Sequence, residues 1–140
     1  MAKSRYEPLV KLKKKALDTA ERALISANNA LSSATDKLNL AYEELSRMSL
    51  PTHGNVGEFT QAAAMIHAQH QTIETCQHTL QSAQHRQHQM RERFKAAMID
   101  FEKFKYLEVQ EMNMKLKHLK RQEDKMLDEI GTMTYKKEEL

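Results

Sequence analysis

The residues in this sequence best suited to chemistry are its histidines, six of which lie between His53 and His88. His67 and His70, like His85 and His88, are three residues apart, which places each pair on one face of a helix. A zinc site needs three or four converging ligands, whereas these histidines alternate with glutamine in QHTLQSAQHRQHQ. The pattern therefore favours a solvated helix face, and we expect neither a metal nor a cofactor.

The single cysteine is the other reactive side chain. Cys76 has no neighbouring cation that would lower its pKa, so it is expected to act as a small buried hydrophobe. The sequence also contains no Gly-rich phosphate loop and no carboxylate pair set apart in a cleft. We therefore expect a protein that is not an enzyme and has no small-molecule substrate.

A basic run opens the chain, with Lys11, Lys14 and Lys15 at its centre and Lys3, Arg5 and Lys13 around them. A basic segment beside leucine heptads is typical of zipper proteins that read DNA as parallel dimers. Here the lysines overlap the first heptad, no Arg and Asn accompany them for base contacts, and the net charge is only +3. A nucleic-acid-binding dimer stays an alternative, weaker than docking on an acidic protein surface or a solvated face.

Proline and glycine divide the chain into its elements, because both destabilise helix interiors. Pro8 suits the first turn of a helix, Pro51, Gly54 and Gly57 cluster in PTHGNVG, and Gly131 lies near the end. We expect a helix over about 8–50, a bend over 51–57, a second helix over about 58–130 capped by Asn55, and a frayed tail over 131–140.

Each predicted helix carries a heptad seam, the pattern of a coiled coil. In the first helix the seam residues are Val10, Leu17, Leu24, Leu31, Leu38 and Leu45, with Ala20, Ala27, Ala34, Ala41 and Met48 three positions on. In the second they are Phe59, Ile66, Ile73, Leu80, Phe94 and Phe101, with Ala62, Cys76, Ala83, Met90, Ala97 and Phe104, and Gln69 and Gln87 interrupt them.

These helices are predicted to fold back into a monomeric antiparallel hairpin. Folding about residue 53 puts Leu45 near Ala62 and Val10 near Ala97. At 1.5 Å per residue the second helix is roughly 110 Å long and the first roughly 63 Å, so about thirty residues overhang. Past Phe104 the apolar seam shifts, which indicates a stutter. The predicted fold is all-α, a two-helix antiparallel coiled coil with the second helix longer than the first and its apolar stripe in need of a partner.

Other classes of protein fit poorly. Strand-forming residues are scarce, and the longest apolar run, Ala62 to Ile66, is far short of the ~20 residues of a membrane span. The opening MAKSRYEP has no apolar core of a signal peptide, so a cytoplasmic protein is expected.

Both ends of the chain resemble the FliJ family of flagellar type III export proteins. The resemblance lies in the opening YEPLVKLKK from Tyr6, in FEKFKYLE, and in KHLKRQEDKMLDEIGTM, which holds the run Arg121, Glu123, Lys125, Asp128 and Glu129. It implies a cytoplasmic component at the inner membrane of the flagellar base, a coiled-coil stalk that joins the export ATPase hexamer to the membrane export gate. It also implies handling of substrate chaperones, and a stalk of a virulence-type secretion system is the alternative.

The resemblance also implies where partners bind. The helix termini would face the ATPase, through Lys11, Lys14, Lys15, Glu123, Lys125, Met126, Asp128, Glu129 and Ile130. The bend end would face the gate, where Phe59, Ala63, Ile66 and His70 fit the family's spacing of i, i+4, i+7 and i+11. Heptad positions add Leu40, Tyr42 and Met65, which are expected to point outward near the bend.

Overall fold

The computed structural model describes residues 4–138, which form two α-helices and, within that range, no strand. Helix α1 spans Glu7–Ser46 with 40 residues, and helix α2 spans Val56–Glu138 with 83. The all-α class and the longer second helix are confirmed. The ends of the predicted tail, residues 139 and 140, and Lys3 of the basic run lie outside the described residues.

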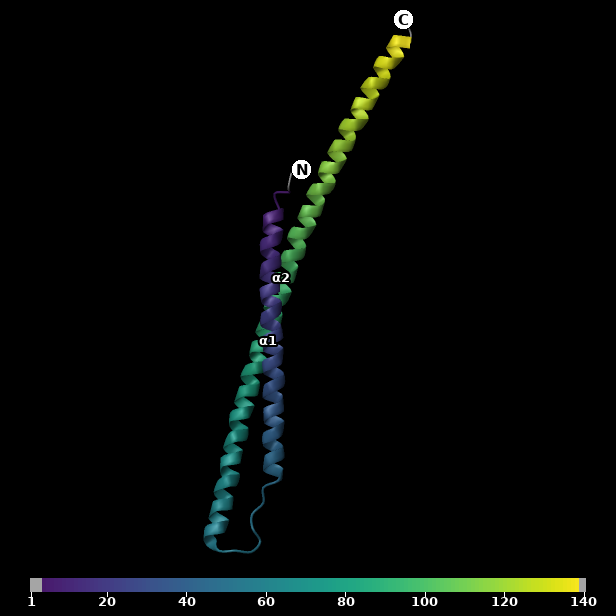
Figure 1. Ribbon diagram of the computed structural model, residues 1–140. Coiled ribbons are helices and arrows are strands. Elements are labelled where there is room, and N and C mark those ends of the chain that lie inside the picture. Colours follow the sequence, from purple (N-terminus) through teal and green to yellow (C-terminus); the bar gives the residue numbers. More distant parts are fainter. Residues whose placement is uncertain (1–3, 139–140) are drawn as a thin grey trace. The chain divides into compact units, whose positions relative to one another are not determined.

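The chain divides into two compact units, each built from both helices. In the unit of residues 18–96, α1 and α2 run side by side in opposite directions and are joined by the bend (Figure 1). The other unit contains the described residues 4–17 and 97–138. There, Ser4 contacts Glu111 and Lys13 contacts Asp100, so the helices are antiparallel in this unit too.

The bend is held by its own polar atoms. The Asn55 side chain accepts a hydrogen bond from the backbone N–H of Glu58 at 2.8 Å, so Asn55 caps α2 as predicted. Gly54 has φ +140°, a conformation that other residues adopt only with strain. Both helices begin slightly before the predicted residues, and α1 ends at Ser46 rather than Leu50, since the chain leaves the helix before Pro51.

The heptad seam is confirmed by burial. All predicted seam residues of α1 are buried or half-buried, and Ala27 is 1% exposed. In α2 the same holds from Ala62 to Phe104, including Gln69 and Gln87. Phe59 is the exception at 49% exposed, because α1 ends too early to cover the first turn of α2. The prediction that Phe59 lies in the seam is wrong.

The predicted pairing of the helices is shifted by about one heptad. Gln69, not Ala62, lies level with the end of α1, where its side chain contacts Ala41 and Glu44. In the other unit, Lys13 pairs with Asp100 and Ser4 with Glu111, so Val10 lies beyond Ala97 along α2. The cause is the bend: nine residues separate the helices, so the end of α1 lies level with Gln69, thirteen residues after the start of α2.

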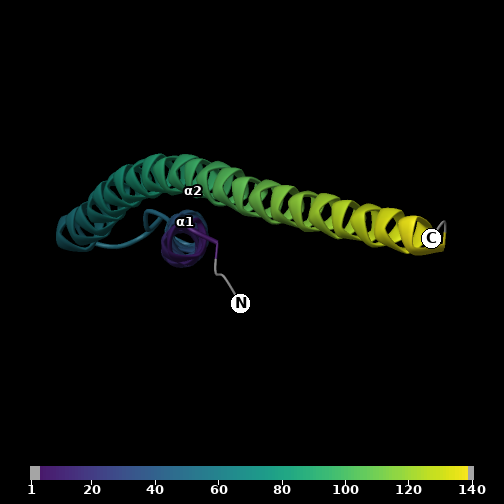
Figure 2. The same ribbon diagram turned by 90° about the horizontal axis from the view of Figure 1, so that it is seen from above.

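Helix α2 continues unbroken to Glu138, beyond the predicted end at Ile130 (Figure 2). A side chain added at Gly131 would meet no atom within 4 Å. A single exposed glycine costs a helix only ~1 kcal/mol, which is less than the neighbouring helix formers supply. Gly131 therefore lies inside the helix instead of ending it.

Candidate interaction surfaces

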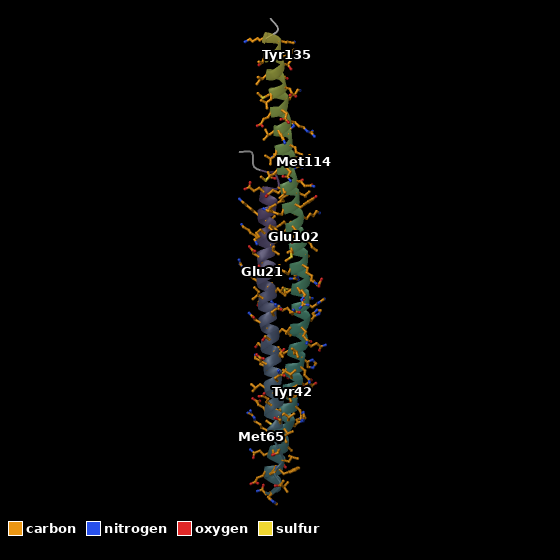
Figure 3. All side chains as sticks on the ribbon, turned by 90° about the vertical axis from the view of Figure 1, so that its right-hand side faces the viewer. Glu21, Tyr42, Met65, Glu102, Met114 and Tyr135 are labelled. Atoms are coloured by element: carbon orange, nitrogen blue, oxygen red, sulfur yellow. The ribbon has the colours of Figure 1, made fainter. Side chains whose placement is uncertain are left out.

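The last part of α2 is an exposed surface that α1 does not cover. We call residues 112–138 the overhang, because Ser4, which lies just before the start of α1, is level with Glu111. All residues from 112 to 137 are exposed, and Figure 3 shows Met114 and Tyr135 on a helix with no second helix beside it. Large apolar side chains at heptad spacing form a stripe that begins at Val109, just before the overhang, and continues along it with Met112, Leu116, Leu119, Met126, Ile130 and Met133.

This overhang stripe does not simply prolong the intramolecular seam. The seam passes Phe101 and Phe104 and reaches Glu108 and Glu111 at its end. The stripe starts one residue later, at Val109 and Met112, which turns it by about 100° around the helix. The stutter predicted past Phe104 therefore separates two apolar faces, one covered by α1 and one bare.

The predicted charged run lies on this bare segment. Glu123, Lys125, Asp128 and Glu129 are exposed, and so are Met126 and Ile130 at 61% and 55%. Glu123 takes the one polar position within the apolar stripe. Of the other three, only Glu129 borders the stripe, at a g position, whereas Lys125 and Asp128 take c and f positions and face away from it. The structure therefore spreads this part of the predicted ATPase-binding set over more than one face of the helix.

The lysines predicted for the same set lie elsewhere. Lys11 contacts Glu7 at 3.4 Å, and the Nζ of Lys14 lies 5.6 Å from the centre of the Phe101 ring. They are therefore level with the covered part of α2, some twenty residues or about 30 Å before Glu123. Lys15 also has an interaction partner. The structure does not bring the lysines and the charged run together.

A polar cluster that the sequence did not reveal fastens the start of the chain to α2. The Ser4 hydroxyl donates to the Glu111 carboxylate at 3.0 Å, Arg5 lies 3.8 Å from it, and Lys115 lies 3.4 Å away. Desolvation raises the pKa of Glu111, but the hydrogen bonds from Ser4 and Lys115 and the charges of Lys115 and Arg5 outweigh it, so the pKa is lowered. Glu111 is thus held as a carboxylate.

The bend end carries the second predicted surface. Five of its predicted residues are exposed, namely Leu40, Tyr42, Phe59, Met65 and His70. The other two, Ala63 and Ile66, are half-buried along the seam. Tyr42 accepts a hydrogen bond from Gln77 at 2.7 Å. It therefore does not lie beside Met65, which is nearer the bend (Figure 3). The predicted cluster of Leu40, Tyr42 and Met65 is spread along the helices by the shifted pairing.

The candidate chemical residues are dispersed. Cys76 is half-buried in the seam, as its heptad position predicts. His67 contacts Gln71 and His118 contacts Gln122, each one turn along the helix. Among the residues that the structure describes, no group of three His, Cys, Asp or Glu could hold a metal ion. In the same range, no helix is long and apolar enough to cross a membrane.

The architecture is that of a two-helix antiparallel coiled coil with exposed surfaces at both ends of its longer helix. The seam of α1 is covered by α2 of the same chain and is therefore not free to form a parallel zipper in this structure. The family model of the flagellar FliJ protein matches residues 2–140, and the chain belongs to this family of flagellar export components. No curated protein and no solved structure gave a significant match.

Proposed function

We propose that this chain is a non-catalytic, cytoplasmic component of the flagellar type III export apparatus that links the export ATPase to the membrane export gate and escorts substrate chaperones. Membership of the FliJ family supports the pathway. The observation that carries the linking role is the bare apolar stripe of the overhang. Large apolar side chains repeated over seven turns of an otherwise solvated helix are typical of a surface covered by another protein.

The overhang suits a partner that encloses a helix. From Glu111 it projects about 40 Å beyond the start of α1, at 1.5 Å per residue. The stripe is flanked by Lys115, Lys120 and Glu129 at its g and e positions, so charged residues of both signs border an apolar centre. An apolar centre with a charged rim is the usual composition of a protein interface. We assign this surface to the ATPase.

Paired substitutions test the ATPase contact. Met126→Glu with Ile130→Glu should abolish co-purification with the export ATPase and leave the helicity of the chain unchanged, because both residues are exposed. The matched control is His118→Glu with Thr132→Glu, two exposed positions away from the stripe. If the stripe variant binds the ATPase as the wild type does, the assignment is overturned. If both variants lose ATPase binding equally, the added negative charge causes the loss and the position of the residues does not matter.

The gate is assigned to the bend end, where exposed apolar residues extend along both helices. Phe59→Ala with Met65→Ala removes two groups near the bend, and each should cost ~1–3 kcal/mol if it lies at an interface centre. Tyr42→Ala tests the more distant position separately. Binding to the cytosolic domain of the gate and motility should fall while the melting temperature stays the same.

The control for the gate contact is Leu12→Ala, which removes an exposed apolar side chain from the other unit. It should bind the gate as the wild type does. Normal swimming and gate binding by the bend-end variants would contradict the assignment and identify Phe59, Met65 and Tyr42 as scattered surface hydrophobes.

A further inference from the structure

We propose that a second copy of this chain covers the overhang stripe, in an antiparallel pairing that sets Leu116 against Met126 of the other copy. The stripe follows strict heptad spacing from Val109 to Met133. The a positions of this heptad are Val109, Leu116, Glu123 and Ile130. The d positions are Met112, Leu119, Met126 and Met133. The pairing does not depend on the proposed contact with the ATPase, but both would occupy the same stripe.

Charge rules out a parallel pairing of two overhangs. In a parallel coiled coil, equivalent a positions meet, so Glu123 would face Glu123 of the second copy in the core. A g position also meets the e position of the next heptad, which would set Lys115 against Lys120 on both edges. Two buried carboxylates and two pairs of like charges oppose this arrangement.

One antiparallel register removes the contact between the two Glu123 side chains and the two pairs of Lys115 with Lys120. With Leu116 against Met126 of the second copy, Met112 meets Ile130, and Leu119 meets Glu123. The g positions then face each other along one edge. Lys115 meets Glu129 of the second copy, the symmetry repeats this pair, and Gln122 meets Gln122 between them. The charges are complementary throughout that edge.

Neighbouring antiparallel registers lose this complementarity. A shift of one heptad in one direction sets Lys115 against Lys136, which repel each other. A shift in the other direction sets Lys115 against Gln122, sets Glu108 against Glu129, and shortens the apolar contact. Along the edge formed by the g positions, the sequence of the overhang therefore favours this antiparallel register over its neighbours.

Glu123 limits the strength of the pairing and fixes its orientation. It lies in the core against Leu119, with Lys120 of the second copy at the next position. On the second edge the e positions face each other and Lys120 meets Lys120 of the second copy. The two Glu123 carboxylates lie beside these lysines around the twofold axis and offset their charge. A polar group at one core position sets orientation at some cost in stability, so the pairing is expected to be reversible and to depend on concentration.

Sedimentation of the purified full chain tests the pairing without any ATPase present. We expect the wild type to pass from monomer to dimer between micromolar and millimolar concentration. Lys115→Glu alone and Glu129→Lys alone place like charges along the edge, and each should remain monomeric at concentrations where the wild type is half dimer. Mixing the two variants restores both opposite-charge pairs and should restore the dimer, as should the double variant.

Two controls make this test decisive. Lys117→Glu makes the same charge change on an exposed residue outside the stripe and its edges, and should dimerise as the wild type does. Leu116→Cys with Met126→Cys, in a Cys76→Ser background, should crosslink two copies, and Leu116→Cys alone should not. A wild type that stays monomeric throughout, a dimer insensitive to the charge reversals, or crosslinking by Leu116→Cys alone would each overturn the proposal.

Discussion

The side-chain amide of Gln69 on α2 donates a hydrogen bond of 2.8 Å to the backbone carbonyl of Ala41 on α1. It lies 3.3 Å from the Glu44 carboxylate as well. Gln69 is the only polar side chain buried among the residues that the structure describes. A buried polar group in an otherwise apolar seam favours the one register that satisfies its hydrogen bonds.

Replacing Gln69 with leucine should raise the melting temperature and weaken the choice of register. Burying a leucine contributes ~1.5–3 kcal/mol, whereas a hydrogen bond contributes about 1 kcal/mol net. Thermal unfolding followed by circular dichroism measures the first effect. The control is Gln87→Leu, whose partner Asn28 is exposed and whose change should be smaller. A lower melting temperature for Gln69→Leu would show that the hydrogen bonds outweigh apolar burial.

Cysteine pairs report the register directly. In a Cys76→Ser background, Ala41→Cys with Gln69→Cys should form a disulfide within one chain, because these residues meet across the seam. Leu45→Cys with Ala62→Cys, the pair expected from folding about residue 53, should not. Non-reducing electrophoresis and mass spectrometry distinguish the products. Efficient closure of the second pair would mean that the helices adopt the shorter bend.

Two glycines should respond to the same substitution in opposite ways. Gly54→Ala forces an L residue to φ +140° and brings its side chain against Glu58, so it should destabilise the bend by about 1–2 kcal/mol. Gly131→Ala lies in a helix with open space around it and should stabilise the end of α2 by about 0.5–1 kcal/mol. Denaturant unfolding measures the loss of stability in Gly54→Ala, and circular dichroism measures the gain in helix content in Gly131→Ala. Stabilisation by Gly54→Ala would contradict the observed bend.

The contact of Ser4 with Glu111 should weaken in acid. The pKa of Glu111 is lowered in the folded chain, so its contribution to stability is present above its unfolded pKa and is lost as the pH falls through the folded value. An NMR titration of the carboxyl carbon should show the lowered pKa, and Ser4→Ala should move it back upward. Glu111→Gln should remove this part of the pH dependence. An unchanged pKa in Ser4→Ala would assign the shift to Lys115 and Arg5.

The seam could be predicted from the sequence because heptad spacing and burial have the same cause. Leu17, Ala27 and Ile73 repeat at intervals that bring them to one side of a helix, and this side is the one the partner helix covers. The stutter past Phe104 was visible for the same reason. The resemblance of the two ends of the chain predicted the family, and the match of the family model over residues 2–140 confirms it.

The pairing of the helices could not be predicted, because a heptad pattern looks the same after a shift of seven residues. The length of the bend decides between the possibilities, and Arg47 to Asn55 carry no periodic signal. Gln69 was visible only as an interruption of the seam, although a polar residue at such a position often marks the register. The bonds of Glu111 join residues more than a hundred positions apart and left no local pattern.

The overhang also differs from the rest of α2 in how its backbone is protected. Its amides depend on the helix's own hydrogen bonds, without the packing that protects residues such as Ile73, so they should exchange with solvent much faster. Any protein that covers the stripe must restrict these fluctuations, and the lost entropy offsets part of the contact energy. For the partners proposed above, this cost would lower the affinity of the overhang while the seam stays closed.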